Sequence, residues 1–311
     1  MITLVQLQYI VAIDTYRHFA TAAQKCFVTQ PTLSMQVKKL EEYLDILIFD
    51  RSKQPVVPTD VGQEIIRQAR IVLKENQKIE ELIAHHKSIV AGKLRLAIIP
   101  SLAPYLLPLF VGNFIKKYPF VHLQVVEMLS EDIIVALQKD TIDAALLVTP
   151  LREDSLIEKP LFYEKIMVYT NQNHVLAQKK EIALADLITP QLWLLSQGHC
   201  FRHQVLNLCS YQSIRQHELP FEYESGSLDT LIRLVDKEGG FTLLPELAVF
   251  EVKNQDLIKN FEQKSPLREV SLVVSRHFVK QKLVEIVGQE IQNALPYSML
   301  DKNRGTLVDW R

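Results

Sequence analysis

The sequence contains few of the residues that cross-link or anchor a protein. Only 3 of its 311 residues are cysteine. An odd number of three argues against a disulfide framework, so we expect free and reactive thiols. No apolar run approaches the roughly 20 residues that a membrane-spanning helix needs; one of the longest runs is Leu106 to Val111. We therefore expect no membrane segment.

An excess of charge of either sign is also missing. Thirty-five basic residues face 36 acidic ones, for a net charge of −1, while 48% of residues are hydrophobic and 23% are charged. This composition is typical of a globular protein, and the length predicts two or three domains. The start, Met1 to Gln8, lacks the basic and apolar segments of an export signal, so the expected compartment is the cytoplasm. Any contact with DNA must depend on where the cations lie.

The first sixty residues predict three helices separated by short turns. Apolar residues recur at helical spacing over residues 4–15, small residues fill 20–26, and a third helix starts at Gln30 with Pro31 in its first turn. Small alanines allow the last two helices to cross closely, as in a helix-turn-helix. Residues 47–59 form short β-like runs around a polar turn, which resembles a wing.

The third helix has a buried side and a polar side. Leu33, Val37 and Leu40 share one stripe, and the opposite side carries groups that can bond base edges and phosphates, although such a face can also be plain solvated surface. The candidate DNA-binding residues are Gln30, Pro31, Thr32, Ser34, Gln36 and Lys38 on this helix, with Arg51 and Lys53 at the tip of the wing.

This region resembles the winged helix-turn-helix of LysR-type transcriptional regulators over residues 4 to 62. The segments that carry the resemblance are residues 19–23, 29–34, 39–41, 47–51 and 58–62, in the expected order. The resemblance implies binding to double-stranded promoter DNA. It also implies that the helical pattern of residues 60–88, with its broad apolar stripe, is a dimerisation helix that places two recognition helices on two half-sites.

From residue 93 onward, β-like runs alternate with helical runs, which predicts an α/β domain with a parallel sheet. We expect strands at 93–99, 121–127, 142–148, 165–170, 192–195, 221–224, 241–244 and 268–275, and helices at 103–118, 131–139, 199–211, 227–237 and 279–294. The order resembles the two-subdomain, doubly wound, periplasmic-binding-protein-like effector domain of LysR regulators. The expected domains are 1–59 (DNA-binding), 60–89 (linker helix) and 90–311 (regulatory, with subdomains 93–163 plus 267–295, and 164–266).

Cys200 and Cys209 lie nine residues apart in a predicted helix. Nine residues of helix advance roughly 13.5 Å, whereas a disulfide needs Cα atoms roughly 4.4 to 6.8 Å apart. The two thiols could join only if the segment unravelled. Such a pair suits a redox switch.

A second resemblance is carried by residues 99–101, 103–108, 198–200 with Arg202 and Gln204, Cys209, and 242–245. Together they resemble the OxyR branch of the LysR family, whose members sense hydrogen peroxide through two cysteines. By that resemblance Cys200 attacks peroxide and Cys209 resolves the product, and Ser101, Ser130, His199 and Arg276 hold the oxidant. Both serines stand where threonine is usual, and His203 stands where aspartate is common. The loss of that anion puts the thiolate pKa and proton delivery in doubt.

The chemistry can also be argued from the residues. A thiolate attacks peroxide, and a helix N-terminus with cations such as Arg202 and His203 favours the thiolate. The product is a sulfenic acid, which a second thiol converts to a disulfide. Cys209, among apolar neighbours, is the candidate partner, whereas Cys26 is interpreted as a core residue of the DNA-binding domain.

Four other interpretations remain open from the sequence. The cysteines could be core residues, the His199 to Cys209 segment could bind a metal without any CxxC or HExxH spacing, the chain could be a thiol peroxidase, or the regulatory domain could bind an organic effector in its cleft with the cysteines incidental. A solute receptor would need the export signal that this start lacks.

We favour a cytoplasmic, peroxide-responsive activator that is not an enzyme and needs no cofactor or metal. Its expected partners are double-stranded DNA, hydrogen peroxide, other copies of itself in a dimer or tetramer, and RNA polymerase. From Pro296 the sequence has little pattern, which predicts a mobile tail or an oligomer contact.

Overall fold

A computed structural model describes residues 1–86, 90–189, 191–209 and 226–310. The chain forms two compact units: an N-terminal unit that begins at Met1 and a regulatory unit that runs from Val90 to Arg276 and from Gln281 onward. Each unit is described by itself. In the described part of the chain, no helix is both long enough and apolar enough to cross a membrane.

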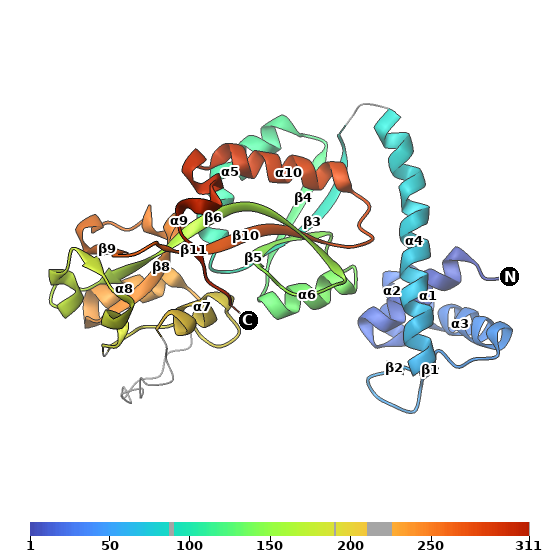
Figure 1. Ribbon diagram of the computed structural model, residues 1–311. Coiled ribbons are helices and arrows are strands. Elements are labelled where there is room, and N and C mark those ends of the chain that lie inside the picture. The colour runs from blue at the N-terminus through green and yellow to red at the C-terminus, as the bar shows by residue number, and fades with distance from the viewer. Residues whose placement is uncertain (87–89, 190, 210–225, 311) are drawn as a thin grey trace. The chain divides into compact units, whose positions relative to one another are not determined.

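The N-terminal unit is a winged helix-turn-helix, as the sequence predicts. Thr3 accepts from the backbone N–H of Gln6 in a capping box at the start of the first helix. Thr29 caps the third helix in the same way through Thr32. The elements are α1 (Leu4–Tyr16), α2 (Phe19–Lys25), α3 (Gln30–Leu44), β1 (Phe49–Asp50), β2 (Val57–Pro58) and α4 (Asp60–His86), visible in Figure 1.

Part of the apolar stripe of α4 packs on its own unit rather than on a partner. Ile66 and Ala69 are buried in the core that α1, α2 and α3 share. Arg70 fixes the same face of α4 because its guanidinium donates to Asp14 Oδ2 of α1 at 2.8 Å. Farther along, among the described side chains of α4, Val72 and Ile79 are 37% and 58% exposed. The predicted stripe residues Leu82 and Ile83 lie outside the described side chains.

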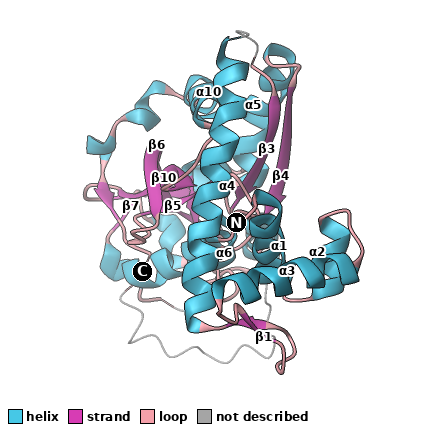
Figure 2. Ribbon diagram, turned by 90° about the vertical axis from the view of Figure 1, so that its right-hand side faces the viewer, coloured by secondary structure: helices cyan, strands magenta, loops and turns pink. Residues whose placement is uncertain are grey.

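The regulatory unit is built on a mixed sheet, not the purely parallel one expected. Strands β4, β3 and β5 are parallel neighbours, but β10 runs antiparallel to both β5 and β6. Figures 1 and 2 show α5 and α10 together on one face and α6 on the other. The bounds are β3 (Gly92–Ile98), α5 (Ala103–Lys117), β4 (Val121–Glu127), α6 (Ser130–Gln138), β5 (Ala144–Thr149), β6 (Leu156–Thr170), β10 (Pro266–Ser275) and α10 (Gln281–Ala294).

A long strand joins the two halves of this unit. The sequence predicts a strand at 165–170, whereas β6 has 15 residues and pairs with β10 in its first part and with β8 and β9 in its last. In place of a strand at 192–195 there is only an isolated bridge at Leu192, and the predicted strand 221–224 lies outside the described residues. The second half contains β7 (Glu181–Ile182), α7 (Cys200–Leu208), α8 (Leu228–Glu238), β8 (Phe241–Pro245), α9 (Glu246–Val249) and β9 (Ile258–Phe261).

The C-terminal residues are not a loose tail. Two short 3-10 turns, Tyr297–Leu300 and Lys302–Arg304, lead into β11 (Thr306–Leu307), which pairs in parallel with the start of β10. Met299 and Trp310 are buried. The sequence carries no periodic signal for this segment because its conformation comes from pairing with distant residues.

Candidate functional site

Cys200 is the first residue of α7 and is 3% exposed. The backbone N–H groups of Cys200 and Phe201 lower the pKa of its thiol. Unpaired N–H groups at the start of a helix carry partial positive charge, so they stabilise a thiolate more than a thiol. The structure thus places Cys200 at the helix N-terminus that the sequence predicts for it.

Hydroxyl groups from two other elements reach this thiol and its surroundings. Ser130, the first residue of α6, is 2% exposed, and its hydroxyl lowers the pKa of the Cys200 thiol. Ser101, between β3 and α5, is also 2% exposed, and its Oγ accepts from Arg268 Nη1 at 3.1 Å. The structure therefore brings Ser101 and Ser130 to the Cys200 end of α7, as the resemblance implies.

The cation beside the thiol is Arg268, which the sequence analysis missed. Its side chain is fully buried, and it lies over the Phe201 ring with its guanidinium carbon 5.4 Å from the ring centroid. Arg268 Nε donates to Glu164 Oε2 at 2.6 Å, and Glu164 is fully buried as well. A buried cation and anion must be paired, because either alone would be costly to remove from water.

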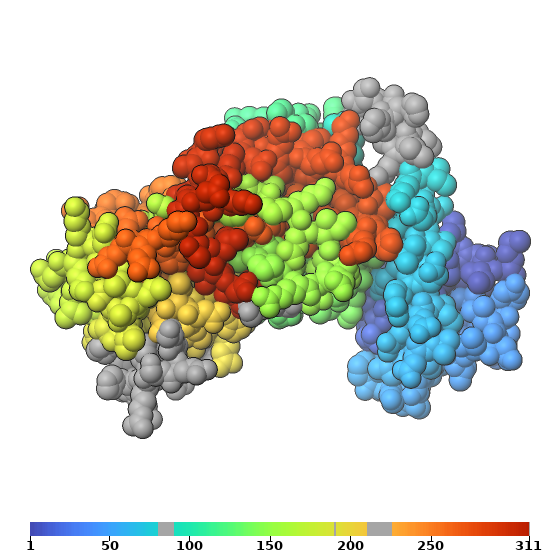
Figure 3. Space-filling view, viewed as in Figure 1, coloured from blue at the N-terminus to red at the C-terminus, as the bar shows by residue number. Residues whose placement is uncertain are grey.

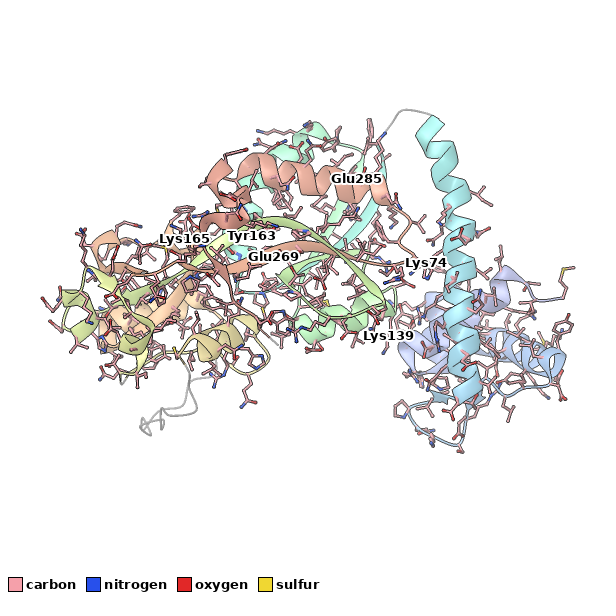
Figure 4. The ribbon with its side chains drawn as sticks, viewed as in Figure 1. Lys74, Lys139, Tyr163, Lys165, Glu269 and Glu285 are labelled. Atoms are coloured by element: carbon pink, nitrogen blue, oxygen red, sulfur yellow. The ribbon has the colours of Figure 1, made fainter. Side chains whose placement is uncertain are left out.

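Strand register explains how this pair forms. Arg268 of β10 lies opposite Glu164 of β6 in the antiparallel ladder. Their neighbours Tyr163 and Glu269 are also opposite one another and are labelled in Figure 4. Alternation along a strand sends adjacent side chains to opposite faces, so Arg268 and Glu164 share one face of the sheet. Glu164 Oε1 also accepts from the backbone N–H of Leu247, which fixes the carboxylate.

Arg276, which the resemblance assigns to peroxide binding, is not part of this cluster. It follows the end of β10, its side chain is exposed, and its backbone N–H donates to the Ser155 carbonyl at 2.9 Å. The arginine that the structure places at the Cys200 end of α7 is Arg268, eight residues earlier. The two arginines flank the mostly apolar residues 270–274 of β10, and the register with Glu164 distinguishes them.

The site as a whole raises the pKa of the Cys200 thiol, whereas the sequence predicts that the helix N-terminus and nearby cations favour the thiolate. Burial raises the pKa of Cys200, and the bond from Ser130, the charge of Arg268 and the two backbone N–H groups lower it, with burial dominating. The predicted cations do not take part, since Arg202 Nη1 donates to the Leu195 carbonyl and His203 is exposed. The resting thiol is consequently protonated, and its reactivity depends on losing that proton.

His199 is the residue before α7 and is 7% exposed. Burial lowers the pKa of its imidazole, so the ring is neutral at neutral pH and one nitrogen can accept a proton. Gly226 lies against this ring: a Cβ at that position would be 3.0 Å from both Cε1 and Nε2. Glycine at 226 therefore lets the chain approach the imidazole closely.

Cys209 ends α7 and is 1% exposed. Burial raises the pKa of this thiol to about 12, with no compensating donor or cation. All three cysteines are free, and an intact α7 separates Cys200 from Cys209. Cys26 is the C-cap of α2 and packs against the N-terminal core, as expected.

A metal site has little support here. Within the described ranges, no group of three or more His, Cys, Asp or Glu side chains could hold a metal ion. A metal bound by His199, Cys200, His203 and Cys209 would need those side chains to converge, and His203 is exposed while the other three are buried.

Comparison with known proteins decides the family. Residues 4–63 match the bacterial regulatory helix-turn-helix of the lysR family, and residues 88–296 match the LysR substrate binding domain. The chain belongs to the LysR family. It is 32% identical to the hydrogen peroxide-inducible genes activator of Haemophilus influenzae over 269 residues, which cover 86% of this chain and 88% of the relative.

Solved structures of OxyR proteins resemble this LysR-family chain. The full-length OxyR of Pseudomonas aeruginosa, with a cysteine-to-aspartate substitution, has a TM-score of 0.77 and 33% identity, covering 94% of this chain and 98% of that chain. A cysteine mutant of OxyR from Corynebacterium glutamicum with hydrogen peroxide bound has a TM-score of 0.61 and 29% identity, covering 94% of each chain.

As in other LysR-family regulators, the helix-turn-helix is the DNA-binding part. Gln30, Pro31, Thr32 and Lys38 are exposed, while Ser34 and Gln36 are half-buried. The Thr32 hydroxyl lies 2.8 Å from that of Thr29, and Lys38 lies 3.6 Å from Glu42.

The two wing cations have different surroundings. Arg51 Nη2 donates to Glu41 Oε2 at 2.8 Å, and its guanidinium lies over the Phe19 ring. Glu41 is buried and also accepts from the backbone N–H groups of Ile48 and Phe49. Arg51 therefore fastens the wing to α3 instead of standing free at its tip, whereas the Lys53 side chain is 66% exposed.

Proposed function

We propose that this LysR-family regulator is a peroxide-responsive transcriptional activator. Hydrogen peroxide oxidises Cys200, and a reversible disulfide with Cys209 then changes the fold of the regulatory unit. The observation that carries this proposal is a buried thiol at a helix N-terminus, contacted by the Ser130 hydroxyl and influenced by the Arg268 charge, with a second buried thiol at the other end of the same helix. The names of the OxyR relatives and the peroxide-bound OxyR structure support it.

In the first step the Cys200 sulfur attacks one oxygen of hydrogen peroxide. The thiol proton passes to the neutral imidazole of His199, the residue before Cys200. The O–O bond breaks, and the leaving hydroxide takes that proton back from His199 to become water. The product is a sulfenic acid. Ser101 and Ser130 supply hydroxyls to hold the oxidant, and Arg268 stabilises the negative charge that develops on sulfur and on the leaving oxygen.

In the second step the Cys209 thiol condenses with the sulfenic acid, which forms the S–S bond and releases water. The order follows from the two environments: Cys209, with a pKa near 12, has no group that favours its thiolate, whereas Cys200 has four. The cysteines are the first residue and the C-cap of α7. Nine residues of helix span roughly 13.5 Å, so the bond requires the helix to open.

Opening α7 provides the link to DNA. The regulator acts as a homo-oligomer, dimer or tetramer, and repacking of α7 at a subunit contact alters the spacing of the DNA-binding units and the contact with RNA polymerase. A coupling of about 1 to 3 kcal/mol is enough to change promoter occupancy severalfold. Gln30, Pro31, Thr32, Ser34, Gln36, Lys38 and Lys53 are the proposed DNA contacts, with Arg51 as a support of the wing.

Three single substitutions test the proposal. Cys200→Ser should abolish peroxide-induced transcription from the regulated promoter, and Cys209→Ser should accumulate sulfenic acid at Cys200, detected by mass spectrometry. Cys26→Ser is the matched control and should respond as wild type, because Cys26 belongs to the N-terminal core. A full response from Cys200→Ser would refute the proposal and would instead favour a LysR-family regulator with an organic effector. Continuous peroxide consumption with added thioredoxin would favour a peroxidase.

A further inference from the structure

The residues after the second 3-10 turn connect two parts of the thiol site. We define them as the C-terminal segment, Gly305 to Trp310. Thr306 and Leu307 pair with Pro266 and Leu267 of β10, directly before Arg268. In Figure 3 the dark red C-terminal residues lie on the surface beside the yellow residues around α7.

The β10 end of the segment is tightly fixed. The backbone N–H of Thr306 donates to the Ser265 carbonyl at 2.9 Å, and that of Val308 donates to the Leu267 carbonyl at 2.9 Å. A Cβ on Gly305 would lie 2.1 Å from the Ser265 oxygen and 2.6 Å from Leu267 Cγ. Only glycine fits so close to the neighbouring strand.

The other end of the segment is bonded to α7. Gln204 Nε2 donates to the Val308 carbonyl at 2.9 Å, and Asn207 Nδ2 donates to the Asp309 carbonyl at 2.9 Å. Gln204 is fully buried, and Asn207 follows three positions later, so both project from one face of α7. Asp309 is also held by Arg152 at 2.6 Å.

These contacts depend on the helical form of α7. The donors keep their spacing only while residues 200–208 are helical, and the acceptors are carbonyls of a segment anchored to the strand of Arg268. An opened α7 loses both bonds.

We propose that the C-terminal segment is a positioning element of the thiol site: through Gln204 and Asn207 it holds α7 closed in the reduced protein, and it thereby slows disulfide formation after Cys200 is oxidised. The slowing of disulfide formation rests on the proposed peroxide function, whereas the hold on α7 does not. Losing one such hydrogen bond should favour the open helix by roughly two- to tenfold.

The test uses the full-length protein with Gln204→Met, Asn207→Ala and the control Asn303→Ala. Methionine keeps the volume of Gln204 but removes its amide. Asn207 is exposed, so its alanine variant should fold even if the first variant does not. Asn303 is an exposed residue of the second 3-10 turn, and its side chain does not contact α7.

Hydrogen exchange of the α7 amides in reduced protein decides whether the segment holds the helix. Exchange should be roughly two- to tenfold faster in either variant than in wild type and Asn303→Ala. Unchanged α7 exchange in the variants would overturn the proposal, whatever happens with peroxide.

A peroxide pulse then separates positioning from a general loss of structure. Disulfide formation should accelerate by the same factor, whereas sulfenic acid formation, measured in the Cys209→Ser background, should stay at the wild-type rate. A change in sulfenic acid formation with an unchanged disulfide rate would overturn the positioning role. Absence of sulfenic acid in the wild type would refute the proposed function, and α7 exchange would still decide whether the segment holds the helix.

Discussion

Replacing Arg268 by methionine tests two roles of its guanidinium, one in stability and one in reactivity. The substitution leaves the Glu164 carboxylate, which is fully buried, without the partner that donates to it at 2.6 Å. Removing one partner of a buried ion pair costs about 3 to 5 kcal/mol. We expect the free energy of unfolding of the regulatory unit, from urea denaturation, to fall by that amount.

The double variant Arg268→Met with Glu164→Gln separates the two roles. Glutamine removes the buried charge and keeps an oxygen that can accept from the Leu247 N–H, so at least half of the lost stability should return. Reactivity should not return, because the charge that lowers the pKa of Cys200 is still missing. A single preorganised donor contributes up to about 10²–10³ in rate, and we expect Cys200 oxidation to slow roughly tenfold or more in both variants.

The control is Lys179→Met, which breaks a pair with Asp186 whose lysine side chain is 46% exposed. Such surface pairs contribute about 0 to 1 kcal/mol, so this variant should unfold and react almost as wild type. Stopped-flow oxidation in the Cys209→Ser background gives the rate. Recovery of the peroxide rate together with stability in the double variant would refute an electrostatic role for Arg268.

Three further predictions concern other residues. Phe27 is 95% exposed, and its φ of 57° lies in the left-handed region that favours glycine. Phe27→Gly should therefore stabilise the N-terminal unit by about 1 kcal/mol in thermal unfolding, and a loss of stability would show that the backbone at Phe27 is not strained. Lys53→Ala should weaken DNA binding and lower the slope of its salt dependence by about 1 without loss of stability. Arg51→Ala should also destabilise the wing, because Arg51 bonds to Glu41. Filter binding measures the affinity and thermal unfolding the stability, and equal stabilities of the two variants would contradict the structural role of Arg51. Because burial raises the pKa of Cys200 and the thiolate is the reactive form, its oxidation rate should climb with pH beyond about 8.5, the ordinary thiol value, and a plateau below pH 8 would contradict the dominance of burial.

The helices of the N-terminal unit and α7 can be predicted from the sequence, because they depend on residues close together in the chain. Periodicity identified α1, Pro31 marked the first turn of α3, and the small residues of α2 indicated the helix crossing. The thiol pair was found from spacing alone, because a helix fixes the relation between positions nine residues apart. The structure places α7 at residues 200–208, close to the predicted 199–211, whose last residues lie outside the described ranges.

Features that depend on distant pairing could not be found in this way. Arg268 and Arg276 both border apolar runs, and the choice between them needs the register of β10 against β6. One signal was available: an arginine and a glutamate inside β-like runs must be paired if they are buried. The C-terminal segment has no periodicity, because its short strand is specified by β10 and by the amides of α7.

Hydrogen exchange of the peptide that carries α7, measured together with the mass of the Cys200 to Cys209 linkage before and after peroxide, tests the central claim most directly. We expect the oxidised wild type to show the linkage and to lose the exchange protection of α7. The Cys209→Ser variant should be oxidised at Cys200 and should keep the protection of α7. A linkage formed with α7 protection unchanged, or no linkage under peroxide, would contradict the account.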